Sequence, residues 1–78
     1  MSDNPTKKIE FKHTLEKNIC MTIKRNGGHI SREGLYASFQ DESFVIDAFI
    51  KSLKSRKYLV EDDSGLYLDM YIYEKLAV

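Results

Sequence analysis

The sequence lacks most of the features that mark secreted, disulfide-bonded or membrane proteins. Its 78 residues include one cysteine, one proline and no tryptophan. A single cysteine excludes an internal disulfide and fits a reducing compartment, so we expect a cytoplasmic protein in which Cys20 is a small residue in or near the core. No apolar run approaches the length of a membrane span, and the polar N-terminus MSDNPTKKIE shows no signal peptide. We therefore expect no association with a membrane.

Residues that carry catalysis or bind metals are equally scarce. Cys20, His13 and His29 do not have the spacing of a nucleophile and its base, and one cysteine with two histidines gives no zinc pattern. The run Asp62-Asp63-Ser64 does not have the spacing of a calcium loop. The pair Gly27-Gly28 is a helix stop and not a phosphate-binding loop. The sequence predicts no enzyme, no metal site and no cofactor.

The chain also lacks a net charge, since 12 basic residues balance 12 acidic ones. Their distribution is uneven, because the residues up to Arg32 carry an excess of four positive charges and the remainder an excess of four negative charges. The balanced total argues against strong non-specific attraction to nucleic acid. The asymmetry still allows a local basic patch.

The strongest pattern in the chain lies between Ser43 and Val60. Apolar residues recur there on one helical face, and they are Val45, Ile46, Phe49, Ile50 and Leu53. The pattern predicts a long helix that ends near Arg56, with either Asp41 or Ser43 as its N-cap. Strand-type residues from Tyr58 to Glu61 follow with no glycine or proline between them.

Shorter patterns predict the other elements. A helix is expected from about Glu10 to Arg25, where Asn26-Gly27-Gly28 stops it. Next come a minimal strand at His29-Ile30 and a short helix over about 32–39 with Ser31 as its N-cap. After the turn 62–65, the alternation from Leu66 to Tyr73 predicts the second strand of a hairpin. Residues 1–9 are expected to be a flexible N-terminus and residues 10–78 one domain.

This order of elements resembles the winged-helix superfamily. The resemblance lies in the runs 29–35, 49–54 and 58–67. It implies an α+β fold in which three helices pack with a small antiparallel hairpin, the wing. It also implies that the helix 43–56 lies in the major groove of DNA and that the wing touches the backbone or minor groove. The wing tip Glu61-Asp62-Asp63-Ser64 departs from the family pattern because it has no Arg or Lys, and we interpret it as a solvated acidic turn.

Under this resemblance, one set of residues forms the predicted nucleic-acid site. These residues are Ser31, Arg32, Ser43, Asp47, Lys51 and Lys54. The basic and hydroxyl side chains would contact phosphates, with Ser43, Asp47 and Lys51 nearest any base edge. Acidic residues in the N-terminal half of this helix oppose such binding, and a solvated helix face is the alternative interpretation.

Aromatic residues predict a second surface. Tyr67, Tyr71 and Tyr73 share one face of the strand 66–73, opposite Leu68 and Met70, and Phe44 is expected to point outward. Tyrosine is enriched at protein interfaces, so this row predicts a homodimer formed through the strand and the first helix. The alternative is that the C-terminal segment packs under the tyrosines.

Together these patterns predict a small homodimeric winged-helix protein that binds double-stranded DNA as a transcriptional regulator or accessory factor. The alternative is a winged-helix adaptor that binds another protein and no DNA.

Overall fold

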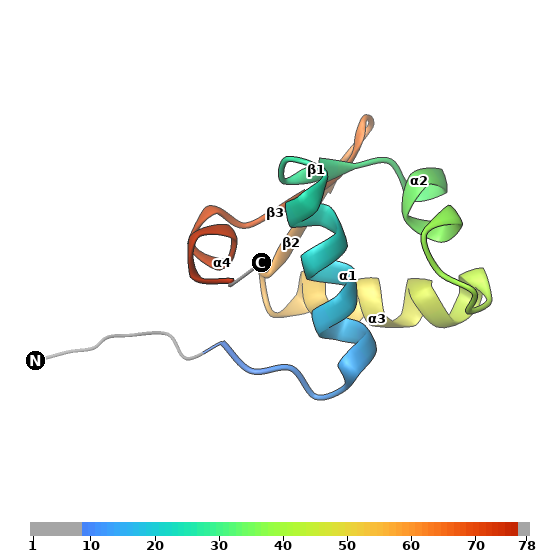
Figure 1. Cartoon of the computed structure of the whole chain (residues 1–78), viewed down its shortest axis with the longest axis horizontal. Coiled ribbons are helices and arrows are strands. Elements are labelled where there is room, and N and C mark those ends of the chain that lie inside the picture. The colour runs from blue at the N-terminus through green and yellow to red at the C-terminus, as the bar shows by residue number, and fades with distance from the viewer. Residues whose placement is uncertain (1–8, 77–78) are drawn as a thin grey trace, which may run out of the picture.

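The computed structural model describes residues 9–76, which form an α+β domain of four helices and one three-stranded antiparallel sheet (Figure 1). The elements are α1 (Thr14–Arg25), β1 (His29–Ile30), α2 (Arg32–Ala37), α3 (Ser43–Ser55), β2 (Leu59–Asp62), β3 (Gly65–Leu68) and α4 (Met70–Lys75). The flexible N-terminus predicted for residues 1–9 lies, apart from Ile9, outside the described residues.

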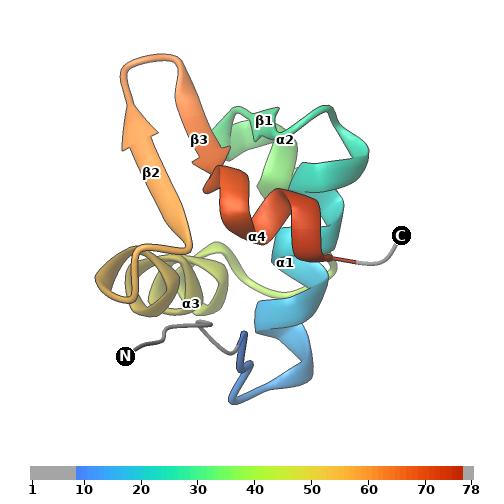
Figure 2. The ribbon, with the colours of Figure 1, turned by 90° about the vertical axis from the view of Figure 1, so that its left-hand side faces the viewer.

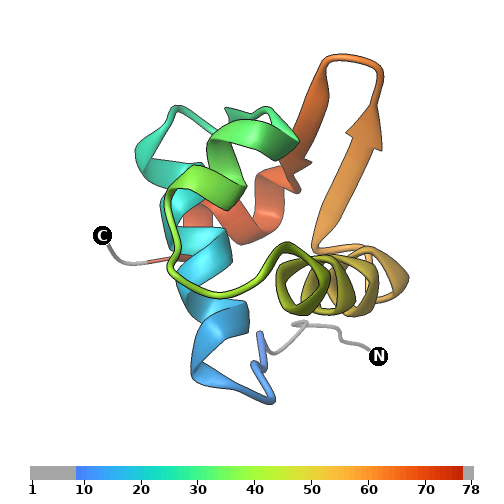
Figure 3. The ribbon, with the colours of Figure 1, turned by 90° about the vertical axis from the view of Figure 1, so that its right-hand side faces the viewer.

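The sheet has the strand order β1-β3-β2, so β3 is the middle strand. The predicted hairpin and the minimal strand are both confirmed, since Val60 pairs with Tyr67 and Tyr67 with His29. Gly65 allows the start of β3 to approach the end of β1 closely, because a Cβ at this position would lie 2.5 Å from the carbonyl oxygen of Ile30. Its φ of +137° is also one that other residues rarely adopt. Figures 2 and 3 show the hairpin projecting beyond the helices.

Helix α1 begins at Thr14 and not near Glu10, so the predicted start is wrong by about one turn. The reason is local capping, because the ring Nδ1 of His13 accepts a hydrogen bond from the N–H of Leu15 at 3.0 Å. The helix ends as predicted: Gly28 donates its N–H to the carbonyl of Ile23 at 2.9 Å. Helix α2 ends at Ala37, two residues before the predicted end at Phe39.

Helix α3 presents the predicted face to the core. Ile46, Ile50 and Leu53 are fully buried, and Val45 and Phe49 pack against them at the margin of the core. The predicted N-cap is wrong on both alternatives. Glu42 occupies that position without a side-chain hydrogen bond, and Ser43 is the first helical residue.

The predicted strand 66–73 is wrong in its second half. Strand β3 ends at Leu68, and Asp69 then caps α4 by accepting hydrogen bonds from the N–H groups of Tyr71 and Ile72 at 3.0 and 3.3 Å. The new helix buries Ile72 and Leu76. The tyrosines therefore do not share one strand face, and the predicted row does not exist.

A buried ion pair joins α1 to the end of α3. The side chain of Glu16 is 2% exposed and lies 2.7 Å from the guanidinium of Arg56. It also accepts hydrogen bonds from the N–H of Lys12 at 2.7 Å and from Ser52 Oγ at 3.3 Å. Burial raises the pKa of Glu16, but the hydrogen bonds and charge of Arg56, with the N–H of Lys12, outweigh it and leave that pKa below its usual value. The pair holds the start of α1 against the end of α3.

Candidate interaction surface

An ion-pair network joins α2, α3 and β2 on the face predicted to meet DNA. Arg32, the first residue of α2, donates to Glu61 on β2 through Nε at 2.5 Å and Nη2 at 3.0 Å. Its Nη1 lies 2.5 Å from Asp47 of α3 and 3.1 Å from the hydroxyl of Tyr36, which also donates to Asp47. Lys54 of α3 donates to Glu61 at 2.8 Å. Two cations and two carboxylates therefore neutralise one another.

The electrostatics of Glu61 and Arg32 follow from this geometry. Hydrogen bonds from Arg32 and then Lys54 lower the pKa of Glu61 to about 2. The hydrogen bond to Glu61 likewise raises the pKa of Arg32 above its ordinary value. Both charges are thus fixed at any physiological pH. A bidentate Arg–carboxylate contact of this kind is among the stronger ion pairs in proteins.

The structure brings together only part of the predicted nucleic-acid set. Arg32, Asp47 and Lys54 meet in the network, whereas Ser31 caps α2 by accepting from the N–H of Gly34 at 3.0 Å. Ser43 and Lys51 are exposed, and neither has an ion pair or a side-chain hydrogen bond among the described residues. Of the three cations predicted to contact phosphates, Lys51 alone has no carboxylate partner in that part of the chain.

Sequence reasoning missed Glu61 and Tyr36 as members of this network. Glu61 lies 29 residues from Arg32, and the sequence pattern places it in the acidic wing tip. No periodic pattern links these positions, because the contact depends on how β2 crosses α2 and α3. The two-residue alternation of a strand is the one signal in the sequence, since it places Glu61 on the same face as Leu59, and in the structure both are turned inward.

The exposed end of α3 carries a large aromatic side chain. Phe44 is 68% exposed in the first turn, as predicted. The exposed acids Asp41 and Glu42 precede it, and exposed Ala48 follows one turn later. An aromatic side chain with this exposure, next to carboxylates, is more typical of a protein interface than of a surface that meets phosphates.

The tyrosines of the predicted interface have separate environments. Tyr67 on β3 stacks on His29 at a centroid distance of 4.4 Å, and its hydroxyl lies 2.8 Å from Ser64 Oγ. Tyr71 is half-buried against the core on α4. The ring of Tyr73 packs on Gly28, with the ammonium of Lys24 4.8 Å from its centroid. The strand predicted to mediate dimerisation is central in the sheet, so both its edges are occupied.

The wing tip is held by its own side chains. Ser64 donates its N–H at 2.9 Å and its hydroxyl at 2.8 Å to Asp62, and these hydrogen bonds lower the pKa of that carboxyl. The ring of His29 contacts the carbonyl oxygen of Ser64 at 3.1 Å. Asp62 and Asp63 are exposed as predicted, but Glu61 is turned inward, so the predicted solvated acidic turn is correct only in part.

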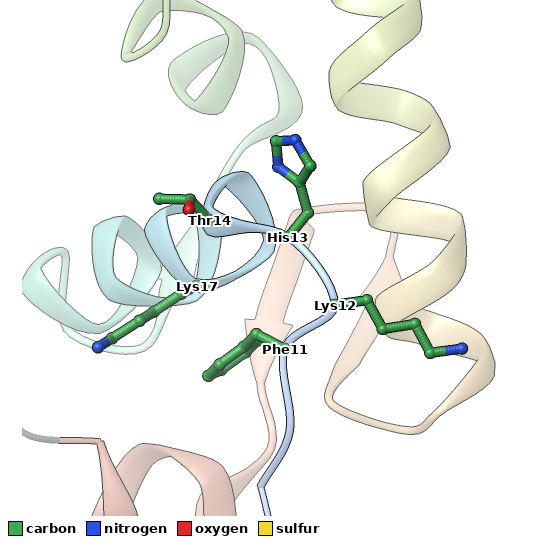
Figure 4. Close-up of a pocket in the computed structure, with 5 residues that line it drawn as sticks. All are labelled: Phe11, Lys12, His13, Thr14 and Lys17. Carbon is green, nitrogen blue, oxygen red and sulfur yellow. The ribbon is translucent and has the colours of Figure 1, made fainter.

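A shallow depression at the start of α1 offers no convergent site. It is lined by Phe11, Lys12, His13, Thr14 and Lys17. Figure 4 shows the two lysines pointing to opposite sides and the histidine turned away from both. The histidine ring lies against Phe49 at a centroid distance of 5.0 Å. In this arrangement the side chains do not converge on a common ligand position.

Within residues 9–76, no three His, Cys, Asp or Glu side chains are grouped so that they could hold a metal ion. None of the described helices has the length and apolarity needed to cross a membrane. Comparisons with protein-family models, curated proteins and solved structures found no match to this chain.

Proposed function

We propose that this chain is a winged-helix domain that binds another protein through the exposed face of α3 and does not bind DNA there. Two features support the winged-helix assignment. The minimal strand β1 pairs with the hairpin β2–β3, and helix α3 directly precedes that hairpin in the chain. Helix α3 lies at the base of the projecting hairpin (Figure 3).

The network around Glu61 is the observation that carries this proposal. Affinity for DNA comes mainly from cations that neutralise phosphates and release counterions. Arg32 and Lys54 are already neutralised by Asp47 and Glu61. A phosphate approaching them would also be repelled by those two carboxylates, which weakens the net attraction.

Phe44 is the residue that favours a protein partner. Interfaces are dominated by a few buried anchors, and aromatic side chains are enriched among them. Phe44 projects from the first turn of α3, so its backbone is already ordered and only side-chain freedom is lost when it is buried. Because Asp41 and Glu42 lie beside it, the partner is expected to offer an apolar pocket rimmed by basic residues.

DNA binding through Lys51 and Ser43 stays a prediction, and one titration separates it from the proposal. Fluorescence anisotropy with a labelled mixed-sequence duplex at low salt should show no saturable binding by the wild-type chain up to about 50 µM. Glu61→Gln should bind measurably more tightly than wild type, because it removes one carboxylate and leaves Arg32 and Lys54 less neutralised. Saturable wild-type binding that Lys51→Glu abolishes would support the DNA prediction and contradict the proposal.

Partner capture tests the role of Phe44. Quantitative cross-linking in a lysate of the source organism should enrich one protein with the wild-type chain, and Phe44→Ala should lose it. Met70→Ala is the matched control, since Met70 is also an exposed apolar side chain but lies on α4. Equal enrichment by wild type and Phe44→Ala would show that α3 is not the binding face.

A further inference from the structure

Strand β2 is an edge of the sheet with one unpaired side. Among residues 9–76, the strand order leaves β3 as the only neighbour of β2. Figures 2 and 3 show β2 at the outer rim of the domain, with no described element along its free side. Natural proteins usually blunt such edges with lysine, proline or a bulge, because exposed edges pair with other strands. The residues of β2, Leu-Val-Glu-Asp, include no lysine or proline; its protection is limited to its short length, the charge of Asp62 and the inward-turned Glu61, which Arg32 and Lys54 neutralise.

The register shows which backbone groups of β2 are free. Asp69 donates its N–H to the carbonyl of Tyr58 at 3.0 Å. Tyr58 and Asp69 are therefore a hydrogen-bonded pair at the end of the β2–β3 ladder. Hydrogen-bonded and non-hydrogen-bonded pairs alternate in an antiparallel sheet. Val60 and Asp62 therefore also bond toward β3. The N–H and C=O groups of Leu59 and Glu61 consequently point to the free side.

We propose that β2 pairs antiparallel with β2 of a second copy of this chain, about a two-fold axis through Val60, to join the two sheets. This register places Leu59 of each copy opposite Glu61 of the other. Both residues have their backbone groups turned outward, so the two pairs can exchange hydrogen bonds without any change in either sheet.

Side chains at the axis fit the same register. Val60 is 57% exposed on the outer face of the sheet. On the axis it would lie opposite its own copy, in the closely spaced type of pair in which side chains touch. Glu61 does not oppose the pairing, because its side chain is turned inward and neutralised by Arg32 and Lys54.

Charge selects the antiparallel orientation. Lys57 lies two residues before β2, and Asp63 lies in the turn directly after it. Neither of these exposed residues has an ion pair within the described part of the chain. Antiparallel pairing brings Lys57 of one copy beside Asp63 of the other, whereas parallel pairing would place like charges together.

Sedimentation equilibrium of the full chain from about 5 to 500 µM tests the dimer. We expect a reversible monomer–dimer equilibrium that Val60→Lys weakens by about tenfold or more, while Val60→Thr, which keeps a β-branched residue, dimerises nearly as well. A monomer at every concentration, or a dimer unchanged in Val60→Lys, would overturn the proposal. Because Phe44 lies in the first turn of α3 and β2 follows the other end of that helix, Phe44→Ala should leave the dimer intact.

A charge swap tests the register itself. Lys57→Glu and Asp63→Lys should each weaken the dimer, and the double variant should restore it, because the opposite charges are then exchanged across the interface. Circular dichroism of each variant should be unchanged, since both side chains are exposed. Failure of the double variant to recover dimerisation, with its fold intact, would exclude this register.

Discussion

Removing the charge of Glu16 should cost about 2 kcal/mol of stability. The Glu16 side chain is almost fully buried, and its charge neutralises the partly buried Arg56. Breaking one partner out of a fully buried ion pair typically costs 3–5 kcal/mol, as an approximate range. Glu16→Gln should cost less, since an amide oxygen can still accept from the N–H of Lys12 and from Ser52. Arg56 also keeps a hydrogen bond to the carbonyl of Glu10 at 2.8 Å.

This loss is large for so small a domain. A chain of this length is expected to have a total stability of roughly 4–12 kcal/mol, and a loss of about 2 kcal/mol should lower its melting temperature by about 10 °C. Urea denaturation followed by far-ultraviolet circular dichroism measures the change directly. Glu33→Gln is the matched control, because it is the same substitution at an exposed residue, and it should fall within about 0.5 kcal/mol of wild type. Equal stability of the two variants would refute the role assigned to the buried pair.

Three further outcomes are expected. Because the pKa of Glu61 is lowered to about 2 by Arg32, its ion pairs contribute stability above pH of about 4.5 that is lost as the pH falls toward 2. Thermal melts across that pH range should show that the Glu61→Gln variant loses less stability than the wild type as the pH falls. Gly65→Ala should destabilise the domain by about 2 kcal/mol or more in urea, whereas Gly27→Ala, with no atom within 4 Å of a new Cβ, should cost about 1 kcal/mol; equal losses would contradict the close approach. Since burial raises the pKa of Cys20 to about 12, a thiol reagent should react with it only after unfolding, and fast reaction in the native protein would contradict its burial.

The helical part of the fold could be predicted because its signals are local. The apolar face of α3 follows from the 3.6-residue period, and the stop at Gly27-Gly28 and the cap at Ser31 follow from backbone chemistry. The C-terminal helix could not be predicted in the same way. From Leu66 to Tyr73 the apolar and polar residues alternate as in a strand, and the residue types favour a strand. The outcome depends on tertiary contacts, since burial of Ile72 and the Asp69 cap stabilise the helix instead.

Three members of the candidate site could be predicted from the sequence, but Glu61, Tyr36 and the charge state of the site could not. Helix periodicity and the order of elements bring Arg32, Asp47 and Lys54 onto one side of the domain. Whether their charges remain available depends on Glu61, whose side chain reaches them only because β2 folds back beside α3. A sequence pattern gives the faces of single elements, whereas an ion-pair network depends on distances between several elements.

The most direct test of the central claim is a ¹H–¹⁵N correlation titration of the wild-type chain with a mixed-sequence duplex at low salt. If Arg32 and Lys54 are neutralised within the domain and Lys51 alone is too weak an attraction for phosphates, the amide signals of Ser43, Lys51 and Lys54 should stay in place as DNA is added. Saturable shifts confined to those three residues and to Arg32 would contradict this account, because they would place DNA on the face where its binding is expected to be absent.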